Sequence, residues 1–235
     1  MDLTASLDRR RRVYLFTGVA VSAIVLFGFS RSYFLKTWFG TPPLSPRLHL
    51  HGMALSLWLV LFLVQTTLIA AGRRRLHQSL GIAGVALAAL AVVTTYAAAI
   101  EAARLGARGG IGTADRLYSS VVVLTLFAVF VAAGTAFRAR PDTHKRFMLL
   151  ATIAVVGPGA QRAVAVAVGH GVRDFHVLVM SALLLVALLS DWRTRARPHW
   201  VLLSGGSLLI ASQLTRRLIG ASDWWTRIGT WMIGS

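Results

Sequence analysis

The sequence predicts an all-α, polytopic transmembrane helix bundle, on the evidence of its composition, the length of its apolar runs and their lack of strand patterning. Hydrophobic residues make up 56% of the 235 residues and charged residues only 14%, which is less charge than soluble domains carry. The apolar runs are long, and about 20 apolar residues cross about 30 Å of hydrocarbon. Because they lack the two-residue alternation of a barrel strand, helices are the expected spanning form.

Seven apolar segments, each bounded by charged or turn residues, are the expected spans. They cover residues 13–34, 48–72, 78–100, 117–137, 146–168, 174–190 and 199–215. The short connections between them predict antiparallel neighbours within one integral membrane domain over residues 1–235. The fifth segment contains Gly157-Pro158-Gly159, which is expected to break its helix inside the membrane.

Basic residues predict the orientation of the bundle. The chain has 25 Lys and Arg against 8 Asp and Glu, and four arginines, Arg9–Arg12, directly precede the first apolar run. Positive clusters flank spans on the cytoplasmic side, so the N-terminus is expected in the cytoplasm. The charges lie in separate short loops, which argues against a nucleic-acid partner. The lipid bilayer is the expected partner, with a membrane-protein partner or a homo-oligomer left open.

Two outer loops and the C-terminal segment have their own predictions. The loop Arg31–Arg47 contains three prolines and is expected to be stiff and extended rather than helical. The loop Leu105–Arg116 is glycine-rich and is expected to be mobile. The segment Asp223–Arg227 holds two tryptophans and is expected to lie along the outer interface.

Histidines stand at the ends of the predicted spans, where they form two layers about one bilayer apart. The outer layer has His49, His51, His170 and His176, and the inner layer has His77, His144 and His199. Imidazole binds haem iron and transition metals. Two haems in two such layers would carry electrons across the membrane, although chance placement at helix ends gives the same layers. The chain has no cysteine, which excludes thiolate metal sites. Histidine is therefore the expected metal ligand, and His49 and His51 are the candidates.

A polar stripe follows His51 through the second span. His51, Trp58 and Gln65 are seven residues apart, so they drift by only about 20° per step around a helix. Gln65 lies deep in the span and is expected to face the bundle interior, as a candidate cofactor-binding residue. The alternative is that Trp58 is a core residue and that Gln65 hydrogen-bonds a neighbouring helix.

Arg162 is the least expected residue of the fifth span, because a buried arginine costs several kcal/mol unless it is paired or hydrated. One interpretation is a cation that holds an anionic group, such as a haem propionate or the headgroup of a lipid or quinone. The other is a structural arginine that snorkels to the interface or pairs with Asp174, the only carboxylate nearby in the sequence.

Three motifs at the heads of spans carry a resemblance: His49-Leu50-His51-Gly52, Leu76-His77-Gln78-Ser79-Leu80-Gly81 and His144-Lys145-Arg146-Phe147-Met148. Over about residues 45–165 they resemble an uncharacterised family of bacterial multi-span membrane proteins. That resemblance implies a place in the bacterial inner membrane and importance for His49, His51, His77 and His144. The L-H-x-x-L-G turn is also distantly similar to two-haem b-type membrane cytochromes. This second resemblance implies two haem-ligand pairs, His77 with His144 and His51 with His176.

Three functions stay open at this point. The first is a redox or metal-handling membrane protein, linked to assembly of a respiratory complex. It would bind haem b or copper through His51, His77, His144 and His176, and Arg162 would neutralise negative charge. The second is a permease or small-molecule-binding protein whose cavity is lined by the polar stripe. The third is a non-catalytic assembly subunit with interfacial histidines. The carboxylates lie at span ends or in loops, which argues against an ion-coupled carrier, and no residue pattern identifies a reaction.

Overall fold

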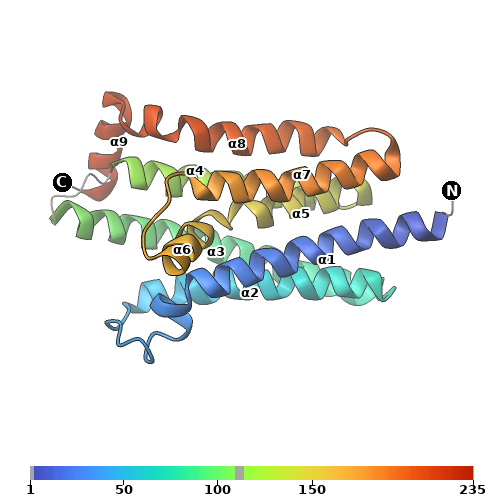
Figure 1. The fold of residues 1–235 in the computed structure, drawn as a ribbon, viewed down its shortest axis with the longest axis horizontal. Coiled ribbons are helices and arrows are strands. Elements are labelled where there is room, and N and C mark those ends of the chain that lie inside the picture. The colour runs from blue at the N-terminus through green and yellow to red at the C-terminus, as the bar shows by residue number, and fades with distance from the viewer. Residues whose placement is uncertain (1–2, 109–113, 235) are drawn as a thin grey trace.

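The computed structural model describes residues 3–108 and 114–234, and these residues are helical with no strand (Figure 1). The elements are α1 (Leu3–Gly28), the π-helix η1 (Ser30–Phe34), α2 (Pro46–Ala70), α3 (Arg74–Arg108), α4 (Ala114–Ala136), α5 (Pro141–Ala154), α6 (Gly157–Val168), α7 (Phe175–Arg195), α8 (Trp200–Gly220) and α9 (Asp223–Ile233). The predicted all-α class is confirmed for this part of the chain.

The long helices lie side by side and alternate in direction, as short connections require (Figure 1). One end of the bundle holds the start of α1 and the α2–α3, α4–α5 and α7–α8 turns, and we call it the N-end. The opposite end holds η1, the α6–α7 turn and α9, and we call it the C-end. The two predicted histidine layers fall at these two ends.

Four helices are long and apolar enough to cross a membrane, namely α2, α3, α4 and α7. The pair α5 and α6 meets the same criterion jointly as one broken span. The prediction of seven spans is therefore supported for the second to sixth segments. It stays a prediction for the first and seventh, because the apolar part of α1 is limited to Arg12–Gly28 and α8 does not meet the criterion.

The fifth span is broken where the sequence predicts it. Helix α5 ends at Ala154 and α6 begins at Gly157, and the two axes differ by 43°. Pro158 has no backbone N–H to donate, and its ring obstructs the preceding turn. The break turns α6 against α1, where Gly28 and Gly159 approach so closely that a Cβ on Gly28 would lie 2.1 Å from the Gly159 carbonyl oxygen.

The core of the bundle is built around α5, which packs on α1, α4, α7 and α8. Its fully buried residues include Leu150 and Ile153, which belong to the same core cluster as Phe127, Met180 and Leu209. The outer faces carry exposed apolar side chains, with Ile82 78% and Leu218 77% exposed. Exposed apolar faces of this kind are stable in the hydrocarbon of a lipid bilayer, as expected for an integral membrane protein.

The loops differ from the sequence expectations in part. The Arg31–Arg47 segment begins inside η1, and only residues 41–45 are without helix or turn. Its fold is held by Lys36 Nζ, which donates to the Pro42 carbonyl, and by Thr41 Oγ1, which donates to the Arg31 carbonyl, both at 2.9 Å.

At the other predicted outer loop, α3 continues to Arg108 and α4 already begins at Ala114. The start of that loop is therefore helical, because the run from Glu101 to Arg108 favours helix. The glycines Gly109, Gly110 and Gly112 lie outside the described residues. The segment after Ser222 forms α9, whose Trp225 is buried edge-to-face against Tyr118 while Trp224 and Trp231 are exposed. This amphipathic helix fits the predicted interfacial position.

Candidate functional site

The structure places two histidines of the N-end next to each other. His77 on α3 and His144 on α5 have ring centroids 6.2 Å apart, with the rings at 82° to one another. Both residues are half-buried. These are the two histidines whose pairing the cytochrome resemblance implies, and tertiary packing brings them together.

The hydrogen bonds of His144 fix its tautomer. Its Nδ1 lies 2.7 Å from the carbonyl oxygen of Gly134, and a carbonyl oxygen can only accept. Nδ1 therefore carries the proton, and Nε2 keeps its lone pair. A backbone carbonyl bonded to one ring nitrogen is a common way for proteins to orient a histidine whose other nitrogen binds a metal.

The facing ring, His77, has an Nδ1 atom that is buried without a partner among the described residues. A ring centroid lies about 3 Å from a metal bound at about 2.0 Å, so two imidazoles that share one ion have centroids at most about 6.3 Å apart. The observed 6.2 Å is near this upper limit. A cluster of three or more His, Asp and Glu ligands is absent from the described part of the chain. His77 and His144 would be the residues that hold a haem iron, or a copper ion with further ligands from elsewhere.

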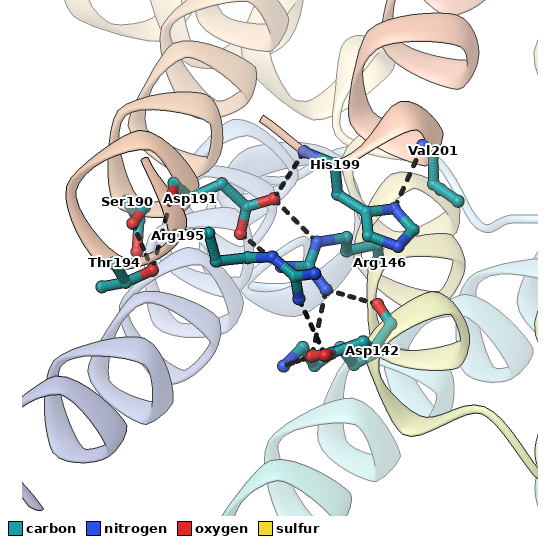
Figure 2. A network of polar contacts seen from close by, with 9 residues as sticks. Asp142, Arg146, Ser190, Asp191, Thr194, Arg195, His199 and Val201 are labelled. Atoms are coloured by element: carbon teal, nitrogen blue, oxygen red, sulfur yellow. Dashed lines mark hydrogen bonds and ion pairs between the residues drawn. The ribbon is translucent and has the colours of Figure 1, made fainter. Parts of the chain in front are cut away.

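Close by, the N-end contains an ion-pair network that the sequence reasoning missed (Figure 2). Arg146 on α5 is completely buried, and its Nε donates to Asp191 Oδ2 at 2.8 Å while its Nη2 donates to Asp191 Oδ1. Asp191 Oδ2 also accepts from the backbone N–H of His199 at 3.0 Å. One carboxylate thus ties α5, α7 and the α7–α8 turn together.

Asp142, at the start of α5, extends this network towards the surface (Figure 2). It accepts from Arg195 at 2.7 Å, from Lys145 at 2.6 Å, and from Arg146. The only signal in the sequence was that Arg146 opens the fifth predicted span and Asp191 directly follows the sixth, at the same membrane face. The described groups are mutually satisfied, so the network stabilises the N-end rather than offering a vacant ligand site.

His199 lies beside this network, in the α7–α8 turn outside the spanning helices. Its Nδ1 accepts a hydrogen bond from the Val201 N–H at 3.2 Å, which caps the first turn of α8 (Figure 2). Burial, together with the nearby Arg146 and Arg195, lowers the pKa of His199 below its ordinary value, against the opposing effect of Asp191 and Asp142. This hydrogen bond makes His199 the N-cap of α8.

At the C-end, His51 is oriented by Thr95 on α3. Its Nδ1 lies 3.1 Å from Thr95 Oγ1, and the Thr95 hydroxyl donates its only proton to the Ala91 carbonyl at 2.5 Å. His51 Nδ1 is therefore the donor, and its Nε2 keeps the lone pair. The guanidinium of Arg162 lies over the Phe29 ring, 4.6 Å from its centroid.

His176, the other half of the implied outer pair, has different partners. Its Nδ1 lies 3.3 Å from Gln161 Oε1, and Gln161 Nε2 donates to the Val172 carbonyl at 2.6 Å. Within the described residues no ring contact joins His51 to His176. Helix α6 packs against both α1 and α7. The His176 imidazole therefore contacts Gln161 of α6 rather than His51.

The remaining candidates are dispersed. His49 packs against the Tyr33 ring, with centroids 5.7 Å apart. Because His49 and His51 are two positions apart on α2, their side chains lie on different faces of that helix. Gln65 Oε1 is buried without a partner among the described residues, and its Nε2 lies 4.0 Å from where a Cβ on Gly81 would stand. Gln65 thus faces α3.

Asp174 does not pair with Arg162. It accepts instead from Arg216 at 2.6 Å and Arg217 at 3.3 Å, both on α8. In the residues that the structure describes, no carboxylate lies within ion-pair distance of Arg162.

The sequence matches no model of a known protein family, and neither a curated protein nor a solved structure matches it. Its apolar helices make it an integral membrane protein by composition and length. Any more specific function has to be argued from the geometry of the two ends.

Proposed function

We propose that this integral membrane protein holds a transition metal, as haem iron or as copper, between His77 and His144 at the N-end. The observation that carries the proposal is the pair itself. Two imidazoles from different helices lie 6.2 Å apart, and one of them is fixed with its Nε2 lone pair unused. A neutral imidazole is the form that binds such metals.

The surroundings of the pair favour a bound metal over an incidental contact. His77 Nδ1 has no partner among the described residues, and a buried polar atom without a partner costs about 1–3 kcal/mol. A metal ligated by imidazole would remove that cost and bridge α3 to α5. The chemistry supplied by haem iron or copper would be one-electron transfer, and the role of His77 and His144 would be to bind and orient the metal.

The same proposal places the N-end in the cytoplasm, with seven crossings. Exposed arginines gather at this end, on the α2–α3, α4–α5 and α7–α8 turns: Arg73, Arg74, Arg75, Arg138, Arg140, Arg193 and Arg197. Positive residues mark the cytoplasmic side of membrane proteins. Seven crossings require α1 and α8 to span the membrane alongside the five more apolar segments. The membrane we propose is the bacterial inner membrane.

The test is an absorption spectrum of the detergent-purified protein, oxidised and then reduced with dithionite, with elemental analysis of the same sample. We expect either a Soret band that sharpens and splits off α and β bands on reduction, or about one copper per chain. The double substitution His77→Ala, His144→Ala should abolish whichever signal is found. His170→Ala, at an exposed position on the C-end, is the matched control and should keep it. Equal cofactor content in all three proteins would refute the proposal.

A second candidate, a small-molecule-binding protein or permease, is favoured by a different observation. Trp58 Nε1 and Gln65 Oε1, both on the polar stripe of α2, are buried without partners among the described residues. Polar atoms left in this state are expected where water or a polar ligand binds. A colourless, metal-free protein, still so after growth with added haem and copper, would favour this candidate over the metal site. If Trp58→Phe and Gln65→Leu then changed nothing in ligand uptake, a non-catalytic assembly subunit would be the remaining interpretation.

A further inference from the structure

Arg162 is held in a way that leaves its hydrogen-bond donors available. Its guanidinium carbon lies over the face of Phe29, 4.6 Å from the ring centroid, a cation–π contact. Among the described residues its N–H groups donate no hydrogen bond. The residue is exposed on α6, and no described carboxylate is within ion-pair distance. The chain thus presents a fixed cation whose counter-ion comes from outside the described residues.

The second group at this position is His51, which offers an acceptor. Thr95 consumes the proton on Nδ1, so the lone pair of Nε2 is free. Both residues adjoin η1: Arg162 lies over Phe29, the Phe29 carbonyl accepts from the Tyr33 N–H at 2.9 Å, and Tyr33 packs against Gly52, the residue after His51. Together they match a ligand that carries both an oxyanion and a hydroxyl group, with the oxyanion on the arginine and the hydroxyl on the imidazole.

The η1 turn and the depth of Arg162 in α6 place these two residues at the C-end of the bundle, near the membrane surface. The η1 turn packs Tyr33 against Gly52, one residue after His51, and Tyr33 Oη donates to the His49 carbonyl at 3.2 Å. Single π-turns are frequent at functional sites. Arg162 lies about 9 Å along α6 from the last residue of that helix, a depth from which arginine reaches the headgroups.

We propose that Arg162 and His51 bind the phosphodiester headgroup of an anionic phospholipid whose headgroup bears a hydroxyl, such as phosphatidylglycerol. The guanidinium binds two phosphate oxygens, and His51 Nε2 accepts from the glycerol hydroxyl. Exposed apolar residues of the adjoining stretch of α1, Leu26 and Phe27, provide a surface for the acyl chains. This site is at the opposite end from the metal site and does not depend on it.

The test is native mass spectrometry of the full chain in detergent, titrated with phosphatidylglycerol, phosphatidylethanol or phosphatidylcholine. Phosphatidylethanol keeps the phosphodiester charge but has no headgroup hydroxyl, and phosphatidylcholine has no net charge. We expect retention to fall in that order. Arg162→Gln should weaken phosphatidylglycerol binding by about tenfold or more, the usual effect of losing a charged hydrogen-bonding partner.

The matched control is Arg31→Gln. Arg31 is also an exposed arginine of the C-end and also stacks on an aromatic ring, with its guanidinium 5.4 Å from the Phe39 centroid. It should leave phosphatidylglycerol binding unchanged. His51→Phe should lower phosphatidylglycerol binding to the level of phosphatidylethanol.

The outcomes that overturn the proposal are distinct. Equal retention of phosphatidylglycerol and phosphatidylcholine, or equal losses in the Arg162→Gln and Arg31→Gln proteins, would exclude a specific lipid site. Displacement of the lipid by millimolar inorganic phosphate would show that the site takes free phosphate instead. If Arg162→Gln fails to fold, Arg162→Lys decides, because it keeps the charge but loses the planar fork: weakened binding supports the proposal and unchanged binding refutes it.

Discussion

The two ends of the bundle hold an arginine in different ways: Arg146 at the N-end is fully buried and Arg162 at the C-end is exposed. At the N-end Arg146 is enclosed, and its Nε and Nη2 donate to the two carboxylate oxygens of Asp191. At the C-end Arg162 stacks on Phe29 and has no described carboxylate partner. A buried charge whose hydrogen bonds are all satisfied fixes the helices around it. An exposed charge with unused donors is suited to bind a ligand.

The largest effect on stability should come from removing one partner of the buried Arg146–Asp191 ion pair at the N-end. Arg146→Met would leave Asp191 buried and uncompensated, and we expect it to lower the free energy of unfolding by about 3–5 kcal/mol. Replacing both partners, Arg146→Met with Asp191→Leu, should restore most of that loss. Thermal unfolding in detergent measures both.

Arg195→Gln is the control for this experiment, because Arg195 contributes a partly exposed ion pair to the same network. Its expected cost is about 0–1 kcal/mol. A similar cost for Arg146→Met and Arg195→Gln would contradict the contrast between the enclosed pair and the rest of the network.

The next effect tests what positions Arg162. In Gly28→Ala the new Cβ would lie 2.1 Å from the Gly159 carbonyl oxygen, a backbone atom that cannot move aside alone. We expect α1 and α6 to separate, with a loss of about 1–3 kcal/mol. Gly81→Ala is the matched helix substitution, since its nearest atom, Gln65 Nε2, is 4.0 Å away; it should be neutral or slightly stabilising. Unfolding curves that rank the two variants the other way would disprove the close α1–α6 contact.

Arg162→Gln should have a smaller effect on stability than either change. In lipid-free detergent only the contact with Phe29 is lost, which is about 0.5–1 kcal/mol at an exposed position. The difference in stability between Arg162→Gln and the wild-type protein should become larger when phosphatidylglycerol is added, because the lipid stabilises only the wild-type protein. Unfolding temperatures with and without the lipid give both numbers. A lipid-independent loss as large as that of Arg146→Met would mean that Arg162, too, is a structural arginine.

The smallest effect concerns pH at the N-end. The lowered pKa of His199 means that the unfolded state binds more protons as the pH falls through about 6.5. The stability contributed by the neutral cap is therefore present above that pH and is lost below it. Unfolding measured between pH 8 and pH 5 should show this decline, and His199→Asn, which keeps a capping oxygen but does not titrate, should flatten it. An unchanged slope in His199→Asn would assign the decline to other groups.

Much of the architecture follows from local sequence. Long apolar runs without alternation specify helices, and the Gly157-Pro158-Gly159 triplet specifies a break, which is a bend of 43° in the structure. The histidines stand at the ends of the apolar runs, so they fall in two layers. Helix propensity, the geometry of proline and the cost of burying polar backbone act over a few neighbouring residues. The turns at residues 35–40 of the Arg31–Arg47 segment were not predicted, because side-chain bonds to backbone carbonyls hold them, from Lys36 to Pro42 and from Thr41 to Arg31.

Which side chains meet was decided only by the tertiary structure. Arg146 and Asp191 are 45 positions apart, and their contact depends on how α5 and α7 are rotated about their axes. The same holds for His77 with His144, and for Asp174, which pairs with α8 rather than with Arg162. Rotation and tilt of packed helices are set by the sum of many small core contacts. The sequence by itself therefore determined the membrane character and the two histidine layers, and packing determined which of their residues form sites.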